Sequence, residues 1–378
     1  MKKIHFIPFH FLLLGVLHLG AETKSFVAYP EPINSYLKRV QQGEQSHAYD
    51  ETENFANWQR KARGALVKIT GLKQMQTQLA GFKPKVIMGE EDRSPKDFTR
   101  TLCSIETEPG VKVPFYLLVP KSANPKRPLP LALCPHGHDS IGLHSYAGVF
   151  KDDKHQAKVL AKEGNVAEQA AQRGFVAIAP ATRGLAKEIS MPDPKGRHGN
   201  RPCRAQLMHC LVAGRTPIAE RVWDMQRILD WAVKLSLVDE SRIVMTGNSG
   251  GGVLTAYTAA IDERVSVAIP SCSFTSVIDE TGFIFHCDCC MVPGLRNWGD
   301  WGELGGLVAP RHLLLVHGVD DSLHHRPTVE KVFGQVRKIY QAAGAVKNVS
   351  LQWGSQGHRF YPSLMWPFIE QGLKLENK

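Results

Sequence analysis

The chain has 378 residues, of which 43% are hydrophobic and 22% charged, so it can bury a full globular core. This balance excludes a disordered or fibrous protein. The formal net charge is +10, but no run of five or more basic residues and no aromatic-basic module occurs, so we expect no nucleic-acid partner.

The first 21 residues predict a secretory signal peptide. Lys2 and Lys3 precede an apolar run, and the small pair Gly20-Ala21 closes it. A proline and two histidines interrupt the run, which is also too short for a membrane-spanning helix. We therefore expect cleavage near Ala21, a periplasmic or secreted protein, and no stable membrane insertion once the signal is removed.

The rest of the chain divides into two parts. Residues 22–100 are polar and helix-leaning, with Trp58 and Leu66 on one apolar stripe, and we expect a helical N-terminal extension. In residues 101–378 short apolar runs alternate with helical stretches. This alternation is typical of an α/β fold with a doubly wound, mostly parallel sheet and helices on both faces. We expect residues 101–378 to form the catalytic domain.

The first strand end with candidate chemistry is "LCPHGHDS". In a doubly wound sheet, ligands bind beyond the carboxyl ends of the strands. His136 and His138 are spaced as two metal ligands could be, but a backbone turn at Gly137 explains the sequence more simply. We expect the N–H of His138 to point into the site and to stabilise a negatively charged oxygen.

Two arginines follow apolar runs further along the chain. Arg183 lies in "ATRG" and Arg215 in "AGRTP". Either could bind a sugar hydroxyl or carboxylate. As an alternative, they could pair with Asp224 or Asp230 and hold helices to loops.

The stretch "RIVMTGNSGGGVL" predicts a strand, a tight turn and a helix, with Ser249 at the tip. Gly247 and Gly251 complete Gly-x-Ser-x-Gly, the pattern of a strained elbow that exposes a nucleophilic serine. The N–H of Gly250 lies at the helix start, where the helix dipole favours an oxyanion. We predict Ser249 as the nucleophile and the N–H of Gly250 as an oxyanion donor.

Eight cysteines in an exported chain can form disulfides, and Cys203 and Cys210 are a plausible pair. The stretch "HCDCC" is similar to a soft-metal site. A structural zinc needs four ligands, however, and no second Cys-x-x-Cys pair occurs. We therefore expect disulfides or packed thiols that order a loop beside the site, and no metal.

Trp298 and Trp301 follow the strand predicted at "VSVAIP". They could form a wall on which a sugar stacks, or they could belong to a hydrophobic lid or core.

Two further strand ends supply an acid and a base. Asp320 and Asp321 follow "LLLVHG", and His358 follows "LQWGSQG". Imidazole titrates near neutrality and can take the proton of a serine, while a carboxylate holds its tautomer. The chain order serine, aspartate, histidine is that of α/β-hydrolases. We predict His358 as the base.

Residues 114 to the end resemble the α/β-hydrolase superfamily, in particular the acetyl xylan esterase and dienelactone hydrolase-like branch of exported bacterial esterases. The matching motifs include "CPHGH", "QRGFVAIAPATRG", "VMTGNSGGG", "HLLLVHGVDD" and "GSQGH". The resemblance implies that the acid lies three residues after Gly318, which selects Asp321, with Asp320 in reserve. It also places the second oxyanion donor at His138.

The function implied is an exported serine esterase that removes acyl groups, foremost acetyl, from a small-molecule or polysaccharide ester. Such an enzyme needs no cofactor, and we expect none. A glucuronoyl methyl esterase, a prolyl-oligopeptidase-like peptidase and a non-catalytic carbohydrate-binding protein on a hydrolase scaffold are the alternatives. The sequence leaves the oligomeric state open.

Overall fold

The computed structural model describes residues 30–197, 199, 201–278 and 286–375. The predicted signal peptide lies outside these residues. The nine strands of the described sheet are β1 (Lys85–Asp92), β2 (Phe98–Glu108), β3 (Val111–Pro120), β4 (Leu129–Leu133), β5 (Val176–Pro180), β6 (Val238–Asn248), β7 (Val267–Ser271), β8 (His312–Gly318) and β9 (Val349–Gly354). The α-helices are α1 (Glu31–Gln41), α2 (Phe55–Ile69), α3 (Leu72–Gln78), α4 (Gly142–Tyr146), α5 (Asp153–Ala161), α6 (Val166–Gln172), α7 (Pro202–Val212), α8 (Pro217–Ala232), α9 (Gly250–Ile261), α11 (Leu295–Trp298), α12 (Trp301–Gly306), α13 (Arg326–Ala342) and α14 (Pro362–Gly372).

The strands form one sheet in the order β1-β2-β3-β5-β4-β6-β7-β8-β9. Strands β5, β4, β6, β7, β8 and β9 are parallel, and β1, β2 and β3 continue the sheet antiparallel. The predicted α/β fold is confirmed. The boundary expected at residue 100 falls inside β2, so the end of the predicted extension is part of the sheet.

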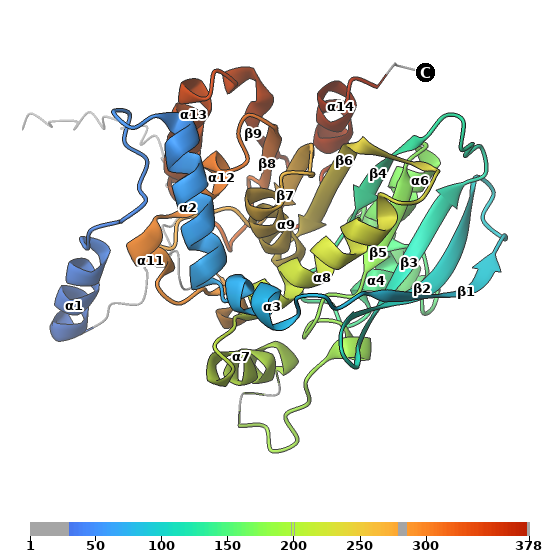
Figure 1. The fold of residues 1–378 in the computed structure, drawn as a ribbon, viewed down its shortest axis with the longest axis horizontal. Helices are drawn as coiled ribbons and strands as arrows, with labels where there is room; N and C mark the ends of the chain where they lie inside the picture. Colours follow the sequence, from blue (N-terminus) through green and yellow to red (C-terminus); the bar gives the residue numbers. More distant parts are fainter. Residues whose placement is uncertain (1–29, 198, 200, 279–285, 376–378) are drawn as a thin grey trace, which may run out of the picture.

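The strands that follow β4 in the chain are added on opposite sides of it, all parallel to it. From β4 the chain passes through α6 to β5 on one side, and then returns through α7 and α8 to β6 on the other side. Because such crossovers are right-handed, α6 covers one face and α8 and α9 the other. In the view of Figure 1, α8 and α9 lie in front of the sheet. The loops after β4 and β6 therefore meet at the point where ligands bind in such sheets.

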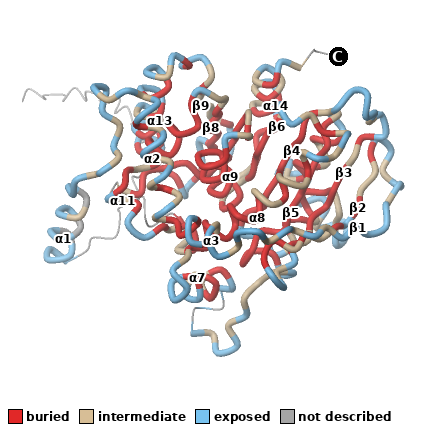
Figure 2. The backbone as a smooth tube through the Cα atoms, in the orientation of Figure 1, coloured by how far each residue is buried: buried red, intermediate tan, exposed pale blue. Residues whose placement is uncertain are grey.

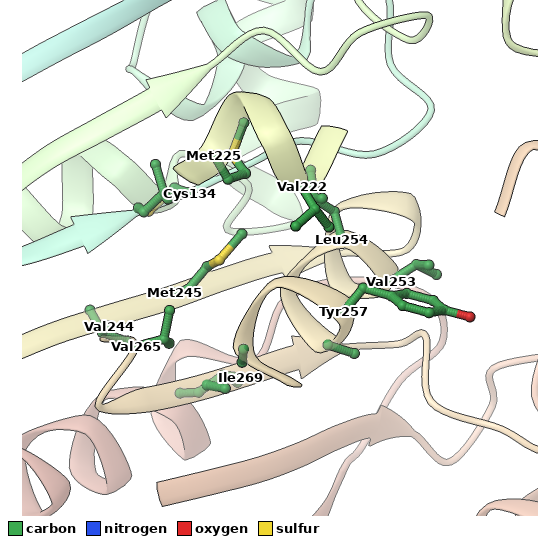
Figure 3. Packing of buried hydrophobic residues seen from close by; sticks show 14 of the residues in the cluster. Cys134, Val222, Met225, Val244, Met245, Val253, Leu254, Tyr257, Val265 and Ile269 are labelled. Atoms are coloured by element: carbon green, nitrogen blue, oxygen red, sulfur yellow. The ribbon is translucent and has the colours of Figure 1, made fainter. Parts of the chain in front are cut away.

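The central strands are buried because both faces are covered. Figure 2 shows the buried backbone concentrated in these strands and in α9, while α1 is largely exposed. Figure 3 shows Met245 of β6 in one cluster with Met225 of α8 and Ile269 of β7. Val253 and Tyr257 of α9 belong to the same cluster. Such dense packing fixes the strand ends that carry the candidate site.

Helix α2 packs on the molecule through a buried stripe, Trp58, Ala62 and Leu66. Asn54 caps its N-terminus by accepting a hydrogen bond from the N–H of Asn57 at 3.1 Å. The helices expected in the N-terminal extension are thus present and belong to the same core. Within the described residues, no helix combines the length and the apolar character needed to cross a membrane.

Candidate active site

Ser249 occupies a strained turn between β6 and α9. Its φ of 57° and ψ of −123° are unusual for any residue other than glycine. The two glycines of Gly-x-Ser-x-Gly permit this turn to approach the loop after β4. A Cβ on Gly247 or Gly251 would lie 2.4 or 2.2 Å from the carbonyl oxygen of Pro135. The strain is a feature of serines held out at the top of a sheet for catalysis.

The loop after β4 runs directly against this turn. A Cβ on Gly137 would lie 2.7 Å from the carbonyl oxygen of Asn248 and 3.0 Å from the nitrogen of Gly250. The N–H of Gly250 is in the first turn of α9, whose N–H groups have no acceptor within the helix. The arrangement leaves the Gly250 N–H available to an oxyanion beside Ser249. The role predicted for the His138 N–H stays a prediction.

His136 holds this loop in place through its imidazole. Nε2 accepts a hydrogen bond from the N–H of Thr182 at 3.0 Å, so Nδ1 is the protonated nitrogen and donates to the carbonyl oxygen of Gly137 at 2.8 Å. Complete burial lowers the pKa of His136 to about 4, which keeps the ring neutral. His136 therefore positions the loop, a role that the sequence analysis did not assign.

Asp321 and His358 form a hydrogen-bonded pair. Nδ1 of His358 lies 2.9 Å from Oδ2 of Asp321, which leaves Nε2 of the imidazole for another partner. The alternative acid, Asp320, is exposed, and its carbonyl oxygen faces Gly357. Of the two candidate acids, Asp321 is the one in contact with His358.

A second histidine supports the same carboxylate. Nδ1 of His324 lies 3.4 Å from Oδ2 of Asp321, and the rings of His324 and His358 stack 6.1 Å apart. Burial alone would raise the pKa of Asp321, but the hydrogen bonds from His324 and His358 outweigh it and lower the pKa well below its usual value. Burial lowers the pKa of His324. Asp321 is thus an anion beside the neutral imidazole of His324. The contact between His324 and Asp321 was not predicted, because nothing in "DSLHH" distinguishes His324 from a surface residue.

Two open cavities meet at Ser249. One, of about 760 Å³, is lined by Gly250, Arg201 and Arg204 in addition to Ser249. The other, of about 500 Å³, is lined by Ser249 and His358. Both cavities also touch His138. A substrate bound at Ser249 therefore has room on two sides.

Two of the described residues that line the larger cavity have buried side-chain atoms without a partner. Among the described residues, Oγ of Ser273 and Nε2 of His286 are buried and have no hydrogen-bond partner. A buried polar atom without a partner is costly, so both atoms lower the stability of the wall of this cavity.

Arg183 and Arg215 do not line either cavity, contrary to the prediction that they bind substrate. Arg183 is buried and pairs with Asp224 at 2.5 Å and Glu108 at 2.6 Å. Arg215 bonds the second oxygen of Glu108 at 2.9 Å. Arg183 therefore has the alternative role, an ion pair with Asp224. A guanidinium that the fold buries needs carboxylate partners.

Trp298 and Trp301 are also buried rather than exposed to a sugar. Nε1 of Trp298 donates to the carbonyl oxygen of Ala62 in α2 at 3.0 Å. Trp301 stacks on His286, with ring centroids 4.8 Å apart. The alternative of a lid or core therefore describes both residues. Trp301 supports the cavity wall from behind, through His286.

The cysteines differ from the predicted pairing. None of the eight is in a disulfide, and the neighbour of Cys203 is Cys287, with the two Sγ atoms 3.8 Å apart, rather than Cys210. Sγ of Cys289 lies 3.4 Å from Nε2 of His138. The cysteines of "HCDCC" thus lie close to two further potential ligands, Cys203 and His138, from distant parts of the chain. A search for a second Cys-x-x-Cys pair could not find them.

The sheet order, the serine turn after β6 and the histidine loop after β9 define the α/β-hydrolase fold. Residues 22–265 match the Abhydrolase family, and the chain belongs to this family. The Bacillus subtilis (strain 168) protein YtaP, named as a proposed hydrolase, is 29% identical over 156 residues. This match spans 39% of the present chain and half the length of YtaP.

Solved structures share the fold at low sequence identity. A proposed acetyl xylan esterase from Bacteroides fragilis NCTC 9343 is 15% identical, with a TM-score of 0.72 over 92% of this chain and 96% of that one. The methylesterase BT1017 is 21% identical, with a TM-score of 0.62 over 92% and 68% of the two chains. A glucuronoyl esterase from Solibacter usitatus is 14% identical, with a TM-score of 0.63 over 87% and 96%.

Proposed function

We propose that this protein is a serine esterase that hydrolyses acyl esters, foremost acetyl esters, on a carbohydrate. The observation that carries the proposal is that Ser249, in a strained turn, shares a cavity with His358, whose Nδ1 bonds the buried Asp321. This is the set of groups that an acyl-transfer site needs.

In the proposed reaction Oγ of Ser249 attacks the ester carbonyl while Nε2 of His358 takes its proton. The N–H groups of Gly250 and His138 stabilise the oxyanion of the tetrahedral intermediate. His358 then gives the proton to the departing alcohol, which leaves an acyl-serine. Water, activated by the same imidazole, releases the acid and restores Ser249, and Asp321 stabilises the imidazolium in both halves.

The substrate class rests on the two cavities and on the fold. One cavity can take the acyl group and the other the alcohol, and their open form suits a sugar unit that extends into solvent. The acetyl xylan esterase and glucuronoyl esterase structures share the fold. We further propose that residues 1–21 direct export, which brings the enzyme to polysaccharides outside the cell.

A specific observation favours a second candidate, the methyl ester of a sugar acid. Arg201 and Arg204 line the cavity beside Ser249. Arg204 already forms an ion pair with Asp288, so Arg201 is the cationic side chain that would suit a substrate that carries or releases a carboxylate.

The test compares the parent protein with Ser249→Ala on three substrates: a chromogenic acetyl ester, acetylated xylan and a methyl-esterified uronate. We expect hydrolysis of the acetyl esters by the parent and a loss of about 10⁶-fold in kcat in the variant, with circular dichroism unchanged. Faster turnover of the methyl ester would select the second candidate. Equal activity of parent and variant would overturn both.

A further inference from the structure

A compact group of four metal-binding side chains lies beside the proposed active site. His138 comes from the loop after β4, Cys203 from α7, and Cys287 and Cys289 from the segment before α11. One ligand atom from each lies within 4.8 Å of all the others. The other two such groups found among the described residues both contain Asp321 and belong to the site described above.

The spacing of these atoms fits a tetrahedral zinc ion. With Zn–S bonds of about 2.3 Å and Zn–N bonds of about 2.0 Å, a tetrahedron separates two sulfurs by about 3.8 Å and a sulfur from a nitrogen by about 3.5 Å. Sγ of Cys203 and Sγ of Cys287 are 3.8 Å apart. Sγ of Cys289 and Nε2 of His138 are 3.4 Å apart. Both distances agree with four ligands around one ion.

The surroundings carry the charge that such a centre requires. Arg221 is buried, and its Nη1 lies 3.4 Å from Sγ of Cys289. Its other hydrogen bonds go to the amide oxygen of Gln206 and to backbone carbonyls, and within the described ranges no carboxylate forms an ion pair with it. A buried guanidinium needs a negative partner. Three thiolates around Zn²⁺ leave a net charge of −1, which Arg221 would balance.

A disulfide between Cys203 and Cys287 is the competing use of these sulfurs. It would consume two ligands, leave Cys289 and His138 without a common partner, and put no negative charge beside Arg221. A centre with three cysteines and one histidine uses all four groups and the arginine.

We propose that His138, Cys203, Cys287 and Cys289 bind one Zn²⁺. The four ligands close the coordination shell, so the ion is structural and takes no substrate. It joins the loop after β4 to α7 and to the segment that carries Cys287, all of which border the larger cavity. The proposal does not depend on the esterase activity, because metal content and spectra can be measured without substrate.

The experiment measures zinc in the purified full-length protein and in Cys203→Ser and His138→Ala, with Cys210→Ser as the control on the same helix. Cys210 is also a buried thiol of α7 but is not one of the four ligands. We expect one zinc per chain in the parent and in the control. In both ligand variants the affinity for zinc should fall by more than about 100-fold. Loss of a group that only supports a metal ligand typically lowers the affinity by about 10–100-fold.

Replacement of zinc by Co²⁺ gives a second readout. The parent should show thiolate-to-cobalt charge transfer and the intense ligand-field bands of a tetrahedral site, and His138→Ala should shift these bands if it still folds. A chelator that strips the ion should lower the melting temperature of the parent. A protein without zinc whose mass is lower by two hydrogen atoms would show the disulfide instead and overturn the proposal. Equal zinc loss in Cys210→Ser would also overturn it.

Discussion

Ser249 combines a strained backbone with the side chain that the proposed chemistry needs. A positive φ at a residue other than glycine costs about 1–3 kcal/mol, and the packing of Gly247 and Gly251 against Pro135 holds the turn in place. The motif around Ser249 therefore predicted the local structure well. The close contact between the Ser249 turn and the loop after β4 could not be predicted, since this contact depends on how β4 and β6 pair.

Relief of this strain should stabilise the protein. Ser249→Gly is expected to raise the free energy of unfolding by about 1 kcal/mol, because glycine adopts a positive φ without strain but also gains freedom in the unfolded chain. Urea unfolding of Ser249→Gly and Ser249→Ala would measure this. Both variants should lack ester hydrolysis, but alanine keeps the strain and should unfold close to the parent. A glycine variant no more stable than the alanine variant would contradict the prediction.

The two neighbouring carboxylates should behave differently. Asp321→Asn is expected to lower kcat by about 10⁴-fold, because the His358 tautomer would no longer be held by a carboxylate. Asp320→Asn, at an exposed position, should change kcat little. Steady-state kinetics of the two variants on one chromogenic ester provides the comparison, and a larger loss in Asp320→Asn would show that the acid is misassigned.

Asp321 should also contribute to stability in a pH-dependent way. Its pKa in the folded protein is lowered, so its contribution is present above the unfolded value of about 4 and is lost as the pH falls below it. The difference in unfolding free energy between the parent and Asp321→Asn should therefore be constant near neutral pH and shrink in acid. A difference that grows as the pH falls from 5 to 3 would contradict this sign.

At the scale of elements, the sequence predicted the parallel strands because both faces of the sheet are covered and each strand is a short apolar run. It missed β1 as part of the sheet because "KVIMGEED" lies at the edge and is almost wholly exposed. An edge strand with acidic side chains is indistinguishable from a polar surface segment until its pairing with β2 is known. The same limit applies to the proposed zinc ligands, since His138 and Cys289 are 151 positions apart in the sequence.

Two helical glycines provide a test of how packing overrides helix propensity. Gly64 in α2 is exposed, and a Cβ there would meet nothing within 4 Å. Gly64→Ala should therefore raise the free energy of unfolding by about 0.5–1 kcal/mol. Gly251→Ala in α9 should destabilise the protein instead, because its Cβ would lie 2.2 Å from the carbonyl oxygen of Pro135. Urea unfolding measures both, and a gain in stability for Gly251→Ala would contradict the packing.

At the scale of the whole molecule, the buried charges connect segments that the sequence analysis treated separately. Arg183 after β5 binds Glu108 of β2 and Asp224 of α8. The sequence could suggest an ion pair for Arg183 but could not show that the residue is buried, because its partners lie far away in the chain. The core likewise extends from the sheet through α9 to α2, so α2 and α3 belong to the same structural unit as the sheet (Figure 2).

Truncations from the N-terminus should separate the part of the extension that the core needs from the part that it does not. The described side chains of α1 are exposed or half-buried, so a chain that starts at residue 43 should keep the stability of the parent. A chain that starts at residue 81 loses α2 and α3. It exposes the apolar surface under Trp58 and Leu66 and removes the carbonyl that binds Trp298. Loss of that burial should cost more than about 5 kcal/mol, most of the stability of an ordinary domain. The melting temperatures of both chains test this prediction. If the chain that starts at residue 81 has the melting temperature of the parent, the remaining residues fold without α2 and α3.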